Sequence, residues 1–166
     1  MEDPLEDSDY ILNELFSSRR QELVSHIPHA IELALEVVDA SPSNATIRLP
    51  VTEHLVGDSE RGVVFGGVIT TLLDQVGGAA VMCGMRELSS IATIDLRIDY
   101  LKAATPGRDL FGHAECYRMT RSVAFVRGAA YHDSPDDPFA IFVSTYMLAA
   151  NPLPPSVFAK LEKSDA

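Results

Sequence analysis

Apolar residues near the start of the chain recur at helical intervals. The segment from about Ser8 to His26 places five of them on one helical face: Ile11, Leu12, Leu15, Phe16 and Leu23. This spacing predicts an amphipathic helix that follows a short acidic tip and ends before Pro28. We therefore expect residues 1–26 to form a tip and a helix outside the main domain.

Strand patterns follow this helix. Residues 34–39 and 45–51 are expected to form two strands, because the SPSN sequence between them favours a hairpin turn. Residues 91–101 alternate strictly and predict a third strand with two different faces. Its apolar face is expected to hold Ile94, Leu96, Ile98 and Tyr100, and its polar face Thr93, Asp95, Arg97 and Asp99.

Three more strands are expected before the chain ends. They cover residues 109–117, 122–132 and 139–149, and prolines at positions 152, 154 and 155 mark the end of the fold. The connections among these strands and the strand at residues 91–101, which include the Pro106-Gly107 turn, are short and of hairpin type. Short connections favour an antiparallel sheet, because parallel strands need crossovers of a dozen or more residues. We expect one domain over residues 27–151 and a tail over residues 152–166.

The longest apolar stretch runs from Gly62 to Met85. It contains six glycines and an Asp-Gln pair near its centre, which makes it a poor membrane span because a charged residue there is costly. We interpret it as one long buried helix, and a helix that is apolar nearly all round must be covered on most sides. A curved antiparallel sheet wrapped around it would do so, which gives an α+β fold.

Composition narrows the class of protein. The chain has 166 residues and a net charge of −11, of which residues 1–9 contribute five acids and no base. An acidic chain is a poor general nucleic-acid binder. The two cysteines, Cys83 and Cys116, and the five histidines show no zinc spacing. No serine-hydrolase elbow, dinucleotide fingerprint or phosphate-binding loop is present, and no secretory signal is apparent, so we expect a cytoplasmic protein.

The sequence GVVFGGVITTLLDQVGG carries the candidate chemistry. Gly66 and Gly67 open the long helix, where unpaired N–H groups suit a carboxylate, a phosphate or a developing oxyanion. Asp74 follows two turns later, on a stripe of small and polar residues with Thr70, Thr71, Gly77 and Gly78. Spacing alone leaves two interpretations open. Asp74 either bonds the backbone of a neighbouring subunit, with glycines that permit close packing, or it is a catalytic or ligand-binding carboxylate.

This segment resembles the hot-dog-fold thioesterase superfamily, in the branch of the phenylacetate-degradation (PaaI-like) acyl-CoA thioesterases. The signature of that branch is HGGxxxxLxD followed by a glycine. Here Phe65-Gly66-Gly67 occupies the HGG positions, and Leu72 and Asp74 fall at the expected offsets. The resemblance extends over residues 27–149 and includes the later sequences IDLRIDYLKAATPG and RSVAFVRGAAYH.

The resemblance implies paired subunits with active sites at their interface, often assembled further into tetramers, and hydrolysis of an acyl-CoA thioester without a cofactor. Carried over by position, Asp74 would be the general base that activates water, or less readily a direct nucleophile. The amide of Gly66, with that of Gly67, would polarise the thioester carbonyl. Thr93 matches a hydroxyl that helps to hold the water. Arg121-Ser122 matches a basic and hydroxyl pair associated with the CoA arm.

Two departures from the family pattern concern the mouth of the expected pocket. Phe65 replaces the motif histidine, and Asp58-Ser59 occupies a loop position where relatives often carry asparagine. The expected substrate and CoA contacts are Phe65, His54, Ser59, Thr71, Arg121 and Ser122. The absence of the histidine motivates a second hypothesis, a non-catalytic acyl-CoA-binding or regulatory protein. A third, a hot-dog dehydratase or hydratase, is weaker because those enzymes use that histidine.

Overall fold

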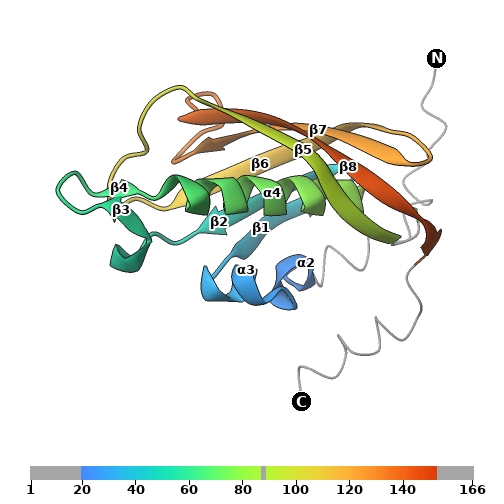
Figure 1. Ribbon diagram of the computed structural model, residues 1–166, viewed down its shortest axis with the longest axis horizontal. Coiled ribbons are helices and arrows are strands. Elements are labelled where there is room, and N and C mark those ends of the chain that lie inside the picture. Colours follow the sequence, from blue (N-terminus) through green and yellow to red (C-terminus); the bar gives the residue numbers. More distant parts are fainter. Residues whose placement is uncertain (1–19, 87–88, 153–166) are drawn as a thin grey trace.

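A six-stranded antiparallel sheet forms the body of the molecule (Figure 1). The computed structural model describes residues 20–86 and 89–152. Across the sheet the strands are ordered β1 (Glu36–Ser41), β2 (Asn44–Leu49), β6 (Leu110–Met119), β7 (Val123–Tyr131), β8 (Ala140–Pro152) and β5 (Ser89–Tyr100). The predicted α+β class and the antiparallel sheet are confirmed.

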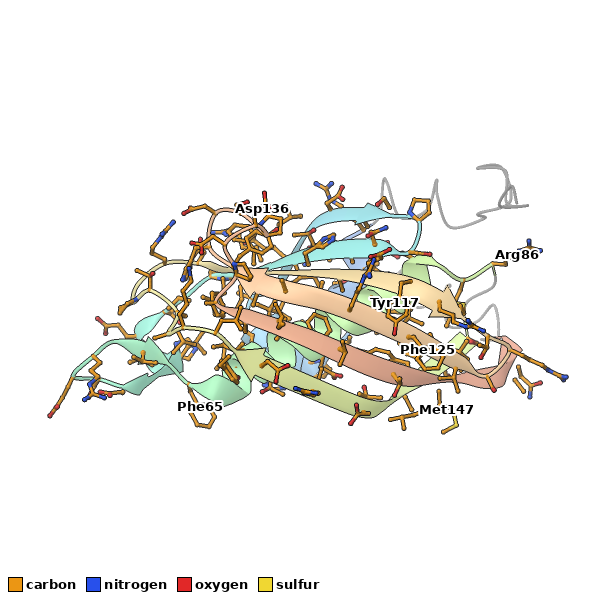
Figure 2. All side chains as sticks on the ribbon, turned by 90° about the horizontal axis from the view of Figure 1, so that it is seen from above. Phe65, Arg86, Tyr117, Phe125, Asp136 and Met147 are labelled. Atoms are coloured by element: carbon orange, nitrogen blue, oxygen red, sulfur yellow. The ribbon has the colours of Figure 1, made fainter. Side chains whose placement is uncertain are left out.

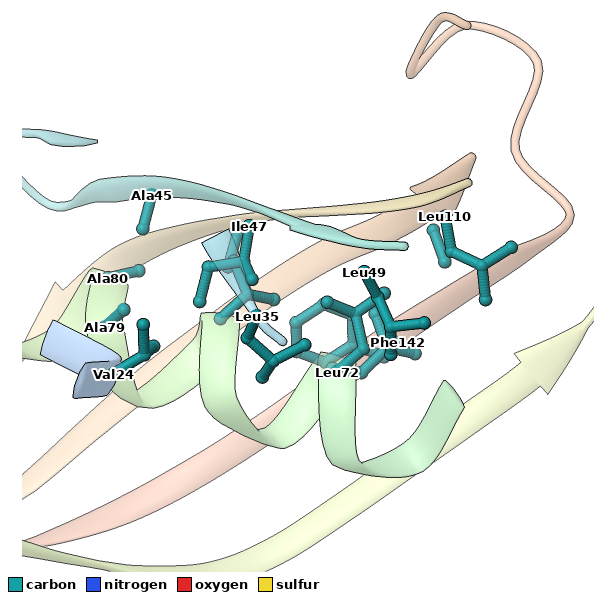
Figure 3. Close-up of a cluster of buried hydrophobic side chains, with 14 of the residues drawn as sticks. Val24, Leu35, Ala45, Ile47, Leu49, Leu72, Ala79, Ala80, Leu110 and Phe142 are labelled. Carbon is teal, nitrogen blue, oxygen red and sulfur yellow. The ribbon is translucent and has the colours of Figure 1, made fainter. Parts of the chain in front are cut away.

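The long helix α4 (Gly66–Cys83) packs on one face of this sheet. Its length and hydropathy would suit a membrane span, but most of it is buried inside the fold. Side chains of β2, β6 and β8 enclose it, and Figure 3 shows part of this cluster: Ile47, Leu49, Leu72, Leu110 and Phe142. The helix is therefore the core around which the sheet curves, as the sequence predicts.

The connection from β5 to β6 differs from the expected hairpin. β5 pairs with β8 at one edge of the sheet, and residues 101–109 carry the chain away from that edge to β6. The prediction of a hairpin was wrong because a short connection does not determine which strand pairs with β5. As a result, one edge of β5 has no strand paired to it among residues 20–86 and 89–152, and the inner side of β5 passes alongside α4 (Figure 1).

The strict alternation expected in β5 is also wrong at one point. The pairing with β8 shifts between Thr93 and Asp95, which leaves Ile94 as a bulge, 56% exposed. A bulge inserts one residue and reverses the faces that follow it. Thr93 therefore shares the helix-facing side with Leu96 and Ile98 instead of lying opposite them.

The N-terminal segment is more broken than predicted. Most of the helix expected over residues 8–26 lies outside the described residues, which contain only α2 (Glu22–Ser25) at its end. Pro28 begins a second short helix, α3 (Pro28–Glu32), because proline is well suited to a first helical position. Gln21 ties this segment to the strand that follows: its amide donates to the Leu35 carbonyl at 2.9 Å and accepts from the Val37 N–H at 2.8 Å.

The polar loop expected before α4 has a structure of its own. It contains a single 3₁₀ turn (Glu53–Leu55) and a two-stranded ribbon of β3 (Val56–Asp58) and β4 (Val63–Val64). At the other end of the chain β8 continues to Pro152, beyond the expected limit at residue 149, and the remaining tail lies outside the described residues.

Candidate active site

Asp74 is half-buried on the side of α4 that faces β5. Its Oδ1 accepts a hydrogen bond from the Thr93 hydroxyl at 2.8 Å. Among residues 20–86 and 89–152, no lysine, arginine or histidine forms an ion pair with this carboxylate. An ionised carboxylate has about four acceptor positions, so Asp74 keeps acceptor capacity for a water molecule or a ligand.

The start of α4 presents unpaired donors. Phe65 is the N-cap residue and offers no side-chain cap; its carbonyl accepts the Val68 N–H at 3.0 Å. Within the described part of the chain, the N–H groups of Gly66 and Gly67 have no acceptor. The first amides of a helix also carry its positive partial charge. They can therefore donate to an oxygen that gains negative charge.

The carbonyls of the same two glycines are engaged. The Thr70 hydroxyl donates to the Gly66 carbonyl at 3.1 Å, and the Thr71 hydroxyl donates to the Gly67 carbonyl at 3.0 Å. Tyr100, on β5, also donates to the Gly66 carbonyl, at 3.4 Å. Thr71 is thus bound back to its own helix, which fixes the first turn. Sequence reasoning did not include Tyr100 in the site, because its strand position signals only a residue on the helix-facing side.

Phe65 forms an exposed aromatic wall at this helix terminus. Its side chain is 63% exposed and lies at the margin of the molecule in Figure 2. The ring covers Gly67, where an added Cβ would meet Cε1 at 2.5 Å, and the residue also lies against Gly57 of β3. The motif position therefore places an apolar surface, and no ionisable group, beside the free amides.

The loop residues lie at this same end of α4. The Phe65 N–H donates to the Leu55 carbonyl at 2.9 Å, which ties the 3₁₀ turn containing His54 to the helix start. His54 is exposed and its Nδ1 lies 3.0 Å from the Thr52 hydroxyl. Asp58 accepts the N–H groups of Glu60 and Arg61, both at 3.1 Å, so its carboxylate stabilises its own turn, while Ser59 is exposed.

Arg121 and Ser122 lie at the opposite end of the molecule. They form the turn between β6 and β7, and Met119 beside that turn lies against Gly84, just past the end of α4. Within one protomer the structure does not bring them to Gly66 or Asp74. The expected CoA contacts thus fall into two groups at the two ends of the helix.

A tyrosine that the sequence did not single out completes the surroundings of Asp74. Tyr146 of β8 is 1% exposed, and its hydroxyl donates to the main-chain carbonyl of Asp74 at 3.0 Å. Burial raises the pKa of Tyr146, as does the nearby charge of Asp74, which keeps the phenol protonated and able to donate. In the sequence this residue is only one apolar position in a strand.

Comparison with known proteins places this arrangement in context. A model of the thioesterase superfamily matches residues 61–138. A Halobacterium salinarum protein whose name assigns it provisionally as an esterase is 35% identical over 94 residues. That match spans 55% of this chain and 61% of the relative, so the chain matches less than two thirds of the relative's length.

Solved structures extend the comparison to most of the chain. A Pseudomonas aeruginosa protein of known crystal structure is 42% identical, and the match covers 78% of this chain and 96% of that protein with a TM-score of 0.71. The PaaI protein from the phenylacetic acid degradation operon of E. coli is 13% identical over 86% of this chain and 99% of that protein, with a TM-score of 0.74. At that identity the likeness is one of fold alone.

Proposed function

Because the chain belongs to the thioesterase superfamily and has its hot-dog fold, we propose that it hydrolyses an acyl-CoA thioester to a carboxylic acid and CoA. The esterase assignment in the name of the H. salinarum relative agrees with a hydrolase. We expect this reaction in the cytoplasm and without a metal or redox cofactor. The observation that carries the proposal concerns Asp74 and the start of α4. The Asp74 carboxylate accepts a hydrogen bond from the neutral Thr93 hydroxyl, and it lies on the same helix as the N–H groups of Gly66 and Gly67, which have no acceptor among the described residues.

The reaction follows from these groups. Asp74 removes a proton from water, and the hydroxide adds to the thioester carbonyl carbon. The carbonyl oxygen becomes an oxyanion that accepts hydrogen bonds from the N–H groups of Gly66 and Gly67. The C–S bond then breaks, and the CoA thiolate leaves and takes up a proton. A positioned base contributes on the order of 10²–10⁴ in rate, and an oxyanion donor about 10²–10³.

The two groups of a single protomer lie far apart for one thioester. Asp74 and Gly66 are eight residues apart on α4, which corresponds to about 12 Å along the helix axis. A base and an oxyanion donor that act on one carbonyl must each lie within about 3 Å of the reacting atoms. We therefore propose that Asp74 of one copy acts with the glycine amides of a second copy, paired through the free edge of β5, and that two such dimers assemble further.

The test is free-thiol release from a panel of short, medium, long and aryl acyl-CoAs. Asp74→Ala and Asp74→Asn should each lower kcat by at least about 10², since the base contributes on that order. Asp95→Asn is the matched control, because this exposed acid faces away from the helix on the same strand as Thr93. Thiol release that continues at the wild-type rate in both Asp74 variants would rule out Asp74 as the general base.

Phe65 supports one alternative, a non-catalytic acyl-CoA-binding or regulatory protein. The motif histidine is absent, and an exposed aromatic ring takes its place. Tight binding of an acyl-CoA, measured by calorimetry, with no thiol release from any member of the panel would favour this alternative over hydrolysis.

A further inference from the structure

Two side chains from neighbouring strands hold Asp74 at two different points. The Thr93 hydroxyl donates to its carboxylate at 2.8 Å, and the Tyr146 hydroxyl donates to its main-chain carbonyl at 3.0 Å. Thr93 and Tyr146 are themselves direct partners across the β5–β8 ladder. We propose that Tyr146 is a positioning residue for Asp74, acting with Thr93 as a two-point clamp; this rests on the proposed function of Asp74 as the base.

The bulge at Ile94 makes the clamp possible. With regular alternation, Thr93 would lie on the side of β5 opposite to Leu96 and Ile98, away from α4. The register shift between Thr93 and Asp95 turns the Thr93 hydroxyl to the same side as its partner Tyr146. Both residues of one cross-strand pair then reach the same helical residue, one at its side chain and one at its backbone.

Gly77 provides the space for the second contact. An added Cβ at Gly77 would lie 2.3 Å from the Tyr146 hydroxyl oxygen and 3.1 Å from Cζ. The ring is buried, so the hydroxyl has no route to solvent and its bond to the Asp74 carbonyl satisfies it. The lack of a side chain at Gly77 therefore allows the Tyr146 hydroxyl to reach the Asp74 carbonyl across one turn of the helix.

The clamp has a consequence for chemistry because placement of a base is demanding. A misplacement of about 1 Å in a reacting group can cost on the order of 10² in rate. Thr93 alone fixes the carboxylate relative to β5, but the turn of α4 that carries Asp74 could still shift. The hydrogen bond from Tyr146 fixes that turn relative to β8, so the position of the carboxylate is held by two adjacent strands, β5 and β8.

Tyr146→Phe tests the proposal, since it removes the hydroxyl and keeps the ring. We expect kcat to fall about tenfold, KM to stay unchanged, and the thermal midpoint to move by only a few degrees. Tyr131→Phe is the matched control, because Tyr131 is a half-buried tyrosine on β7 that stacks on Phe111 of β6. A purely structural tyrosine would lower the thermal midpoint without this selective loss of kcat.

A double-mutant cycle with Thr93→Val tests the clamp as a unit. Residues that position one group together show non-additive effects, so the double variant should lose less kcat than the product of the two single losses. A kcat for Tyr146→Phe equal to that of Tyr131→Phe would overturn the proposal, and so would single losses that simply multiply.

A measurement independent of turnover separates this proposal from the proposed function. The carboxyl carbon of Asp74, assigned through Asp74→Asn, should give one resonance in wild type that shifts or broadens in both Tyr146→Phe and Thr93→Val, while that of Asp95 stays fixed. If the wild-type protein releases no thiol from any acyl-CoA, the proposed function fails and this resonance alone decides the clamp. An unchanged Asp74 resonance in Tyr146→Phe would refute it.

Discussion

Gly77 and Gly78 are adjacent in the helix yet have different neighbours. A Cβ at Gly77 would collide with the buried Tyr146 hydroxyl at 2.3 Å and approach the Phe142 ring at 3.4 Å. A Cβ at Gly78 would meet the terminal methyl of Ile91 at 3.3 Å, a side-chain end that can rotate away, and would reach Tyr146 Cε1 only at 3.9 Å, an ordinary van der Waals contact. The two positions therefore form a matched pair for testing packing around Asp74.

Alanine substitutions at these two glycines should have different effects on the free energy of unfolding. Alanine gains up to about 1 kcal/mol over glycine inside a helix, and overpacking a buried site costs about 1–3 kcal/mol. Gly77→Ala should therefore lower the free energy of unfolding, while Gly78→Ala leaves it unchanged or raises it, both measured by urea titration. Adding Tyr146→Phe to Gly77→Ala should recover part of the loss. Equal stability of the two single variants would contradict the packing described for Tyr146.

At the scale of single residues, the sequence predicted the placement of those candidate residues that are close together along the chain. Gly66, Gly67 and Asp74 lie on one helix, so their spacing alone suggested a helix terminus with a carboxylate two turns on. Tyr146 lies 72 residues from Asp74, and no local pattern connects the two. Its role depends on which strands become neighbours, which the sequence left undetermined.

At the scale of elements, hydrophobic periodicity predicted the long helix and the later strands to within a few residues. Periodicity failed where the backbone departs from regular geometry. The bulge at Ile94 exchanges the two faces of β5 from that residue onward. The order of apolar and polar residues along the chain does not reveal whether a bulge is present. The β5–β6 connection failed for a related reason, because the pattern contains no information on pairing partners.

At the edge of the sheet opposite β5, the strands are joined by a network of ion pairs. Asp109, just before β6, accepts two hydrogen bonds from the Arg48 guanidinium of β2, at 2.9 and 2.7 Å, and one from the Val51 N–H at 3.2 Å. Arg48 also pairs with Glu36 of β1 at 2.6 Å. The hydrogen bonds from Arg48 hold the pKa of Asp109 below its ordinary value of 3.8. This network spans β1, β2 and the start of β6.

Asp109 should make stability depend on pH in one direction. A carboxyl whose pKa is lower in the folded state than in the unfolded state stabilises the fold above the unfolded value, and that contribution disappears as pH falls through the folded value. Asp109→Asn should therefore lower the urea midpoint at pH 7, and the gap from wild type should close below about pH 4. The control is Asp95→Asn, since no ion pair within the described residues holds Asp95. A gap that stays constant from pH 7 to pH 3 would contradict the assignment.

At the scale of the whole molecule, the outer face of the sheet exposes several large apolar side chains. Figure 2 looks onto this face and shows Tyr117, Phe125 and Met147 on three neighbouring strands. Four large apolar side chains here are 41–53% exposed: Tyr117, Ile141, Val143 and Met147. Large exposed apolar patches mark association sites. In the proposed assembly the edge of β5 pairs two copies, and we expect the outer face to form the contact between two such dimers.

Met147→Glu should reduce the assembly by half without unfolding the protomer. Met147 lies opposite Ala92 and Val123 in the ladder, so both of its direct cross-strand partners are apolar and neither can pair with the new carboxylate. Light scattering should show a tetramer in wild type and a dimer in the variant, with thiol release retained because the paired edges remain. Asp136→Lys, on an exposed loop, is the charge control. A wild-type protein that stays monomeric at micromolar concentration would contradict both assignments.

The position of β5 at the sheet edge has a consequence for regulation by mass action. Edge strands have hydrogen bonds on one side only and fray more readily than central strands. Thr93 and Tyr100 both lie on this strand, so the hydroxyls nearest Asp74 and Gly66 belong to an edge strand. A second copy that covers the edge would order the strand and its hydroxyls together. Dilution would then act as an inhibitor, and the concentration of the protein itself would set how much of it is competent.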